Sequence, residues 1–236
     1  MARESEPADD AAATGYAEPA GDTVVVGEAR WPMAGAVLAA MVLTILLPDA
    51  VRLGPQWVLP LIEGVLLVAV IAGDPVTVSR RSRELRALSI VLVSVLVLGA
   101  LWATVQLISD LIHGGPETNS AADLLEAGTI VWVSNNIAFA LLYWELDGGG
   151  AAARAHHLPT HADLAFPQQL NPRIAPPDWR PRFIDYLYLG VTNATAFSPT
   201  DVMPLAPWAK IAMAIQSLVS LGILGLVIAR AVNVFT

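Results

Sequence analysis

Hydrophobic runs separated by short polar segments set the pattern of this chain. Four of them cover Trp31 to Leu47, Gln56 to Gly73, Ala87 to Ile112 and Leu124 to Trp144, and a fifth ends near Arg230. A helix needs about 20 mostly apolar residues to cross the hydrocarbon core of a bilayer. The pattern therefore predicts an all-α fold, a polytopic membrane helical bundle with about five spans, and places four of them in residues 31–146.

The stretch before the fifth run is less regular. Residues 147–182 form a polar linker rich in Gly, His and Pro. The residues that follow are only half apolar, and they end at the turn-forming sequence Ser198-Pro199-Thr200-Asp201. This segment is too short to cross a bilayer, and it leads directly into an apolar run. Residues 183–236 are thus predicted to form a re-entrant helix and loop followed by the final transmembrane helix.

The segment from Phe183 to Leu205 has the sequence FIDYLYLGVTNATAFSPTDVMPL. It resembles the pore segment of tetrameric potassium-type channels, in which a pore helix leads through a threonine-rich Gly-Tyr-Gly filter to a proline. Four residues stand at matching positions: Thr192, Thr195, Asp201 and Pro204. The resemblance implies a channel-like pore module and a homo-oligomer, which would be a tetramer.

A closer resemblance is to an uncharacterised family of bacterial multi-pass membrane proteins that are distantly channel-like and lack this filter. It also takes in Phe139 to Tyr143 and residues 165–167. It therefore covers roughly the C-terminal half of the chain. Because that family has no agreed activity, the resemblance implies an architecture and little chemistry.

Residues 198–200 depart from the potassium filter in a way that matters physically. Backbone carbonyls line such a filter, and glycine permits the required geometry because it adopts positive φ freely. Pro199 fixes φ at about −65° and biases Ser198 toward extended geometry. Potassium selectivity is therefore not expected. The sequence is compatible with a wider pathway for monovalent cations, lined by hydroxyls and ending at the Asp201 carboxylate, or with an ordinary turn.

Several polar residues lie inside the hydrophobic runs. Glu63 is the costliest of them to bury, and an ionisable group within a span is by default a functional candidate. We expect it either to relay a proton or contact a cation, or to reach the nearby interface or bond a neighbouring helix. The others either line a wet path or bond neighbouring helices, and we favour helix packing for them. They are Asn135 and Asn136 in the fourth run and Gln216 and Ser220 in the fifth.

Composition supports the membrane assignment and excludes some other classes of protein. The chain is 55% hydrophobic and 14% charged, with a mean hydropathy of +0.58. Cysteine is absent, which excludes disulfides and thiolate chemistry. The net charge of −8 comes largely from residues 1–30, which have few large apolar side chains and are predicted to form a disordered acidic tail. A basic surface for nucleic acid is missing.

Positive charge predicts the orientation of the spans. Four arginines follow the second run, and Arg154, Arg173, Arg180 and Arg182 lie in the 147–182 linker. Such loops stay in the cytoplasm, so the chain is predicted to be an inner-membrane protein with its N-terminus inside. That places the linker on the side opposite to the one it has in potassium-type channels. We favour an inverted re-entrant segment over a sixth crossing or an outside N-terminus.

No nucleophile elbow, phosphate loop or paired-histidine motif occurs, so neither an enzyme nor a cofactor is expected. His156, His157 and His161 are expected to be solvated, without a metal. The leading hypothesis is a channel-like membrane protein with weak cation preference. One alternative is a non-conducting scaffold that recruits partners through its tail and linker. The other is a small-solute transporter that uses Glu63 with Asn135 and Asn136.

Overall fold

The computed structural model describes residues 27–78, 82–114, 120–156, 162–171, 173–176, 179–195 and 202–235. Within these residues the fold is all-α, as predicted, with helices α1 to α8 and two short β-ladders. The long and medium helices match the hydrophobic runs closely. They are α1 (Trp31–Leu46), α2 (Val58–Gly73), α3 (Arg83–His113), α4 (Ala121–Leu146) and α8 (Pro207–Phe235).

Three of these helices, α3, α4 and α8, are long and apolar enough to cross a membrane. The prediction of membrane-spanning helices is confirmed to this extent. Helices α1 and α2 are also apolar but have 16 residues each. At about 1.5 Å of rise per residue they are somewhat shorter than the roughly 30 Å of a typical hydrocarbon core.

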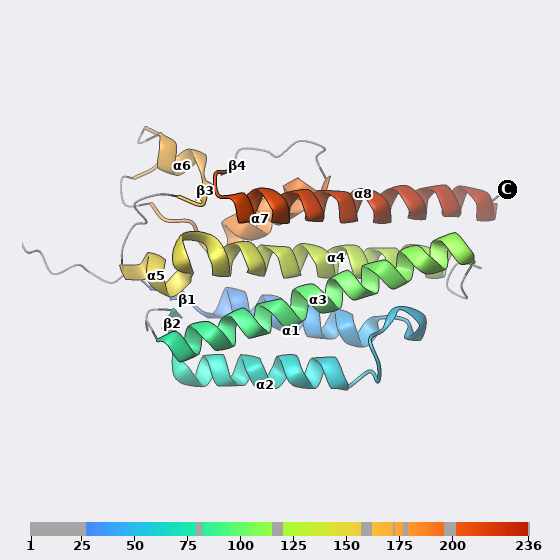
Figure 1. The fold of residues 1–236 in the computed structure, drawn as a ribbon, viewed down its shortest axis with the longest axis horizontal. Coiled ribbons are helices and arrows are strands. Elements are labelled where there is room, and N and C mark those ends of the chain that lie inside the picture. Colours follow the sequence, from blue (N-terminus) through green and yellow to red (C-terminus); the bar gives the residue numbers. More distant parts are fainter. Residues whose placement is uncertain are drawn as a thin grey trace, which may run out of the picture.

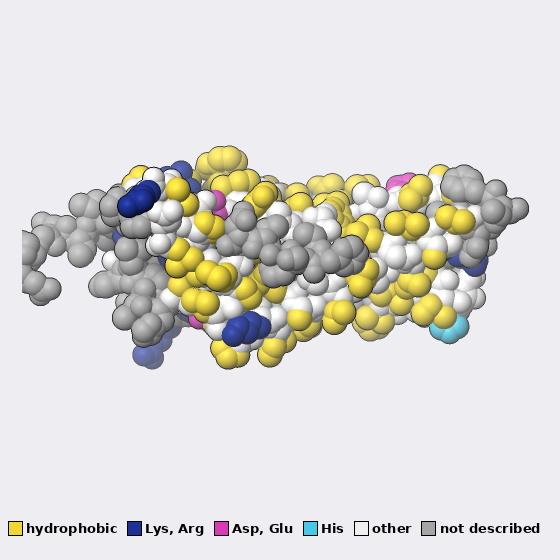
Figure 2. Space-filling model, turned by 90° about the horizontal axis from the view of Figure 1, so that it is seen from above, with side chains coloured by type: hydrophobic (Ala, Val, Ile, Leu, Met, Phe, Trp, Pro, Cys, Tyr) yellow, Lys and Arg dark blue, Asp and Glu magenta, His cyan; other side chains and the backbone are white. Residues whose placement is uncertain are grey.

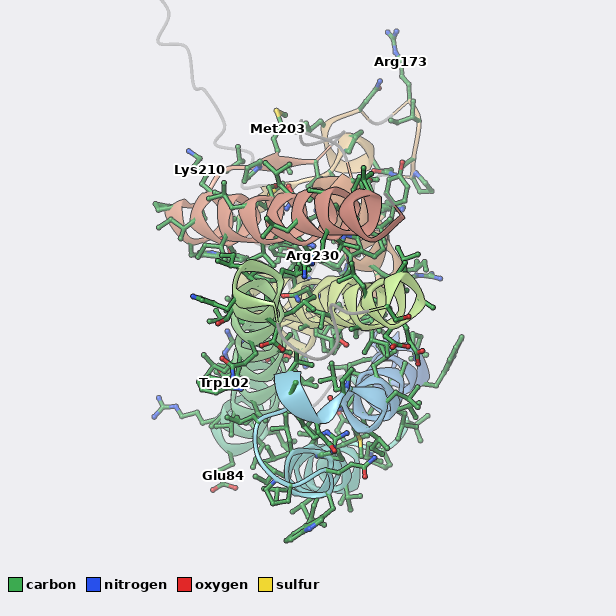
Figure 3. All side chains as sticks on the ribbon, turned by 90° about the vertical axis from the view of Figure 1, so that its right-hand side faces the viewer. Glu84, Trp102, Arg173, Met203, Lys210 and Arg230 are labelled. Atoms are coloured by element: carbon green, nitrogen blue, oxygen red, sulfur yellow. The ribbon has the colours of Figure 1, made fainter. Side chains whose placement is uncertain are left out.

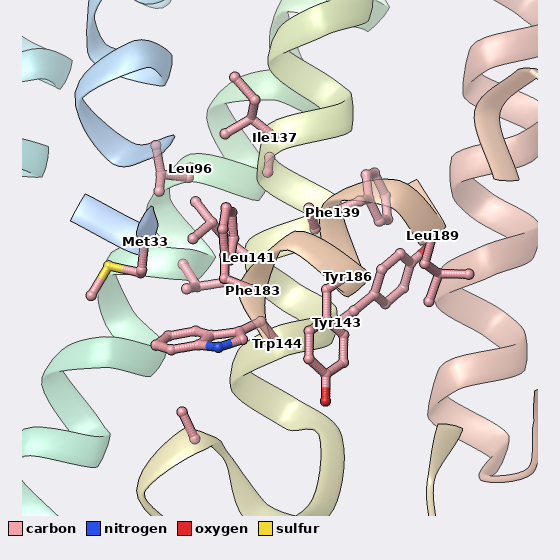
Figure 4. Packing of buried hydrophobic residues seen from close by; sticks show 14 of the residues in the cluster. Met33, Leu96, Ile137, Phe139, Leu141, Tyr143, Trp144, Phe183, Tyr186 and Leu189 are labelled. Carbon is pink, nitrogen blue, oxygen red and sulfur yellow. The ribbon is translucent and has the colours of Figure 1, made fainter. Parts of the chain in front are cut away.

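Helix α4 lies at the centre of the bundle. It packs against α1, α3, α7 and α8, while α2 packs on α1 and α3. Viewed along the helices, α8 lies on one side, α4 and α3 in the middle, and α1 and α2 on the other side (Figure 3). The core between α4 and α7 is rich in aromatic side chains, among them Phe139, Tyr143 and Tyr186 (Figure 4).

Helix α7 (Phe183–Thr195) has 13 residues, about half the length of the helices beside it. It begins at the end of the bundle that holds α5 (Ala151–His156) and runs part of the way along α4 (Figure 1). The chain is back at that same end by β4 (Met203–Pro204), which pairs antiparallel with β3 (Leu164–Ala165). Both ends of the 183–204 segment therefore lie beside the linker.

The linker has more structure than its polar composition suggests. After the short helix α5 and the strand β3 comes α6 (Pro167–Leu170). Between α6 and α7, Trp179 packs on Phe166, whose ring also meets Tyr186 of α7 edge-on at 5.3 Å. These contacts cover one end of the bundle, which we call the linker end. The other end, where α1 ends and α2 begins, we call the far end.

The disordered tail was predicted to cover residues 1–30, but its last residues are ordered. Glu28 and Ala29 form β1, which pairs antiparallel with β2 (Thr77–Val78). Arg30 follows and forms an ion pair with Asp74 at 3.5 Å. The pairing was not visible in the composition of residues 1–30, because it depends on partners more than 40 positions away. Residues 1–26 lie outside the described residues.

The surface of the bundle is largely apolar along its length. Figure 2 shows hydrophobic side chains over most of the visible face, with most of the visible Lys and Arg toward the linker end. Large apolar side chains exposed on the outer helices include Leu38, Val68, Leu98, Leu218 and Ile228. Such a surface suits a lipid environment.

Candidate functional site

Buried polar side chains gather at two places inside the bundle. The first is centred on Gln216 of α8, whose side chain is 1% exposed. Its Oε1 accepts hydrogen bonds from Tyr143 Oη at 2.7 Å and Asn193 Nδ2 at 2.8 Å. Its Nε2 donates to the carbonyl of Gly190 at 2.9 Å and, at 3.5 Å, to Asn136 Oδ1. One amide thus joins α4, α7 and α8.

Neighbouring groups extend this arrangement. Asn193 Nδ2 also donates to the carbonyl of Met213 at 3.0 Å. The hydroxyl of Ser217 lies 3.1 Å from Asn193 Oδ1 and 3.2 Å from the carbonyl of Asn193. We define the Gln216 network as the set that shares these bonds: Asn136, Tyr143, Gly190, Asn193, Gln216 and Ser217.

A glycine allows the helices to come close enough for the network to form. A Cβ at Gly190 would lie 3.2 Å from the carbonyl oxygen of Asn136 and 3.6 Å from Gln216 Nε2. Any larger side chain would push α7 away from α4. The short α7 is therefore held in the bundle by close packing together with side-chain hydrogen bonds.

The second place is centred on Glu63 of α2, whose side chain is also 1% exposed. It lines a cavity of about 20 Å³ between α1, α2, α3 and α4, which we call the Glu63 cavity. Glu63 Oε2 and the hydroxyl of Ser134, which lines the same cavity, have no hydrogen-bond partner among the described residues. This place differs from the Gln216 network in having unsatisfied buried oxygens.

Asn135 lies next to Ser134 and turns toward α3. Its Nδ2 donates to Thr104 Oγ1 at 2.7 Å and to the carbonyl of Val131 at 2.9 Å. Its Oδ1 has no partner among the described residues. Asn135 and Asn136 are adjacent in sequence but belong to different polar groups, because a helix turns by about 100° per residue.

The residues predicted to line a pore do not lie together in the structure. Asn136 and Gln216 have protein partners within the network, and Ser220 is buried in the chain. Thr192 and Thr195 donate their hydroxyl protons to carbonyls of α7, at 2.9 Å in both cases. The remaining filter-like residues, Ser198, Pro199, Thr200 and Asp201, lie outside the described residues.

Two carboxylates at the linker end, which accept hydrogen bonds from the first turn of α7 and its neighbours, were not predicted from the sequence. Glu28 accepts hydrogen bonds from the indole nitrogen of Trp144 at 2.8 Å and from the backbone nitrogen of Phe183, the first residue of α7, at 2.5 Å. Asp147 accepts from Tyr186 Oη at 2.5 Å and from the backbone nitrogen of Leu164 at 3.2 Å. These carboxylates fix the start of α7. The only sequence signal was their position beside a predicted span.

Arginines complete the linker end. Arg154 is buried, donates to the carbonyl of Trp144 at 2.8 Å and lies over the ring of Tyr186 at 5.0 Å. A cavity of about 350 Å³ opens nearby between Arg30, Arg86 and the first residues of α5. Burial lowers the pKa of the Arg30 guanidinium, and its ion pair with Asp74 opposes that effect.

Comparisons with protein families, with curated proteins and with solved structures found no match to this chain. The resemblance to the pore segment of potassium-type channels therefore remains a prediction. Within the described residues, no group of three or more His, Asp or Glu side chains is arranged to hold a metal ion. His157 and His161, two of the three linker histidines, lie outside those residues.

Proposed function

We propose that this chain is a multi-pass inner-membrane protein in which α1, α2, α3, α4 and α8 cross the bilayer and α7 is re-entrant. The observation that carries the proposal is the path of the 183–204 segment. Its helix is half the length of its neighbours, and the chain is back at the linker end where β4 pairs with β3. One face of α7 packs on α4 and α8. A segment that enters and leaves on one side is tolerated within a membrane where protein covers its irregular backbone.

The orientation in this proposal follows from the arginines. The linker end holds the start of α3 with Arg83 and Arg86, and the linker with Arg154, Arg180 and Arg182. Among the described residues, the far end has fewer: Arg52, which pairs with Asp49 at 2.6 Å, and Arg230 in the last turns of α8. The positive-inside rule puts the linker end in the cytoplasm. The re-entrant segment would then enter from the cytoplasm, opposite to the direction of a potassium-channel pore helix.

The activity we propose is a channel-like pathway for monovalent cations with weak preference and no potassium selectivity, formed in a homo-oligomer. A fixed half-helix beside a spanning helix supports this, because a pore helix has to be held rigidly. Gln216 and Ser220 are buried within one copy. The proposed lining is therefore the hydroxyls of Thr195, Ser198 and Thr200, with the Asp201 carboxylate at the mouth. The apolar outer faces of α7 and α8, with Ile184 and Leu218 exposed, are available to lipid or to another copy.

Ion flux through liposomes that contain the full chain tests this function. The expected result is cation flux above anion flux, with similar rates for sodium and potassium. Asp201→Asn should reduce the cation preference, because it removes the carboxylate at the mouth of the pathway. Asp185→Asn is the matched control, since this carboxylate lies at the linker end, where it accepts a hydrogen bond from the backbone nitrogen of Arg182.

Two outcomes would contradict the proposal. Liposomes that hold the intact, folded chain and show no flux above empty liposomes would favour the non-conducting scaffold. Flux whose cation preference is the same in wild type and Asp201→Asn would remove the role of that carboxylate.

A further inference from the structure

The Glu63 cavity lies among α1 to α4, separate from the re-entrant segment. Its volume of about 20 Å³ is close to what one water molecule needs. Polar side chains on its wall come from Thr44 of α1, Glu63 of α2 and Ser134 of α4, and Arg52 reaches it from the turn before α2. The rest of the wall is apolar or glycine.

Three of these side chains have hydrogen-bonding capacity that no described residue uses, and the third of them is the Nε of Arg52. Glu63 is 1% exposed with an unpartnered Oε2, and Ser134 is 8% exposed with an unpartnered hydroxyl. Thr44, by contrast, donates to the carbonyl of Ala40 at 3.0 Å. Buried polar atoms are nearly always satisfied, by protein or by an ordered water. The unpartnered oxygens therefore point to a small ligand.

We propose that Glu63 is the proton-binding group of an intramembrane site, with one water in the cavity between its carboxyl group and Ser134. The water passes a proton to the carboxylate and takes up another in exchange, so it stays neutral, and the carboxyl returns its proton by the reverse relay. Only a proton moves, and no bond between heavy atoms changes. The site does not rest on the channel-like function proposed above, because none of its residues belongs to α7 or α8.

A proton fits this site better than a metal cation, because it needs fewer ligands and less room. Hard cations such as Ca²⁺ and Mg²⁺ need about six oxygen ligands, and the described wall offers side-chain oxygens from Thr44, Glu63 and Ser134 with room for about one water. A proton, in contrast, needs no added room at the buried Oε2.

Few ionisable side chains lie on the described wall around Glu63. Helix α1 presents Thr44, α3 presents Leu96, Gly99 and small apolar residues, and α4 presents Ser134 and Ala138. Arg52 is the other ionisable side chain on the described wall, and it is held by Asp49 at 2.6 Å and by the carbonyl of Leu47.

Infrared difference spectroscopy of the full chain in liposomes tests the proposal, because a protonated carboxyl group has its own carbonyl band. The band assigned to Glu63 is the one present in wild type and absent in Glu63→Gln. It should be present at neutral pH and weaken as the pH rises. Ser134→Ala should shift its frequency, because the water loses one hydrogen-bond partner.

The matched control is Glu84→Gln, an exposed carboxyl at the start of α3, which should leave the band unchanged. The proposal would be overturned by wild-type and Glu63→Gln spectra that coincide at every pH. A band that does not respond to pH would overturn it as well, since the carboxyl would then be a permanent structural group. Loss of the band on adding sodium at fixed pH would replace the proton with a metal cation.

Discussion

The Gln216 network and the Glu63 cavity are both buried polar places in one bundle, but they differ in how their hydrogen bonds are used. In the network, Gln216 accepts two hydrogen bonds and donates two, all to protein groups. In the cavity, Glu63 and Ser134 each keep an atom without a partner among the described residues. A satisfied network rigidifies a structure, whereas an unsatisfied one needs a further reason to exist. The first place holds α7, and the second suits a ligand.

The largest expected effect is in the network. Gln216→Glu replaces the donor Nε2 by an oxygen that faces the carbonyl of Gly190 and Oδ1 of Asn136. We expect the free energy of unfolding to fall by about 3 kcal/mol, because a buried donor is lost and a charge is left unpaired. Denaturant unfolding in mixed micelles measures it. A variant as stable as wild type would show that the amide is not needed to hold α7.

Next in size is the close approach of α7 to α4. Gly190→Ala places a Cβ 3.2 Å from the carbonyl oxygen of Asn136, so the helices must move apart and stability should fall by about 1–2 kcal/mol. Gly225→Ala is the control, because nothing lies within 4 Å of a Cβ at this exposed site in α8. The control should gain up to about 1 kcal/mol from helix propensity. Equal thermal shifts for both variants would contradict the account of close packing.

A single hydroxyl gives a smaller test of the network. Tyr143→Phe removes the bond to Gln216 Oε1 but leaves that oxygen its bond from Asn193. The loss should therefore be about 1 kcal/mol. Tyr188→Phe on the exposed side of α7 serves as the control and should be neutral. The two variants are compared in the same unfolding assay, and indistinguishable values would argue against the network.

The smallest effect is expected at the cavity. Ser134→Ala removes a hydroxyl without a described protein partner, so its cost should stay below about 0.5 kcal/mol. Ser217→Ala is its counterpart in the network, where the hydroxyl lies 3.1 Å from Asn193 Oδ1, and it should cost about 1 kcal/mol. A reversed order in their melting temperatures would mean that the two places do not differ as described.

Much of the bundle could be predicted from the hydrophobic runs, because burial in lipid or protein imposes apolar stretches of fixed length. The run from Ala87 to Ile112 became α3, with one more turn at its start, where Ser82 is extended and Glu84 falls in the first turn. The helix ends at Gly114, whose φ of 80° is the left-handed geometry that glycine adopts freely. Local signals of this kind can be read from sequence.

The sites were harder to predict, because they depend on contacts between distant residues. Glu63 was found because a charge inside an apolar run stands out, whereas Asn193 was not singled out for packing. Its partner Gln216 lies 23 positions away in the sequence. Tyr143, which also bonds Gln216, lies 73 positions from Gln216. Glu28 was assigned to a disordered tail, yet it caps α7 across 155 positions at Phe183. Composition carries no information about such pairs.

The free energy of unfolding of Glu63→Gln tests the difference between the two places most directly. It is the reverse of the Gln216→Glu exchange and keeps almost the same shape. We predict that Glu63→Gln is at least as stable as wild type at neutral pH, because no described partner is lost and an amide, like the protonated carboxyl, buries no charge. A loss as large as that of Gln216→Glu would contradict the account, since it would mean that the Glu63 carboxylate is a structural partner like Gln216.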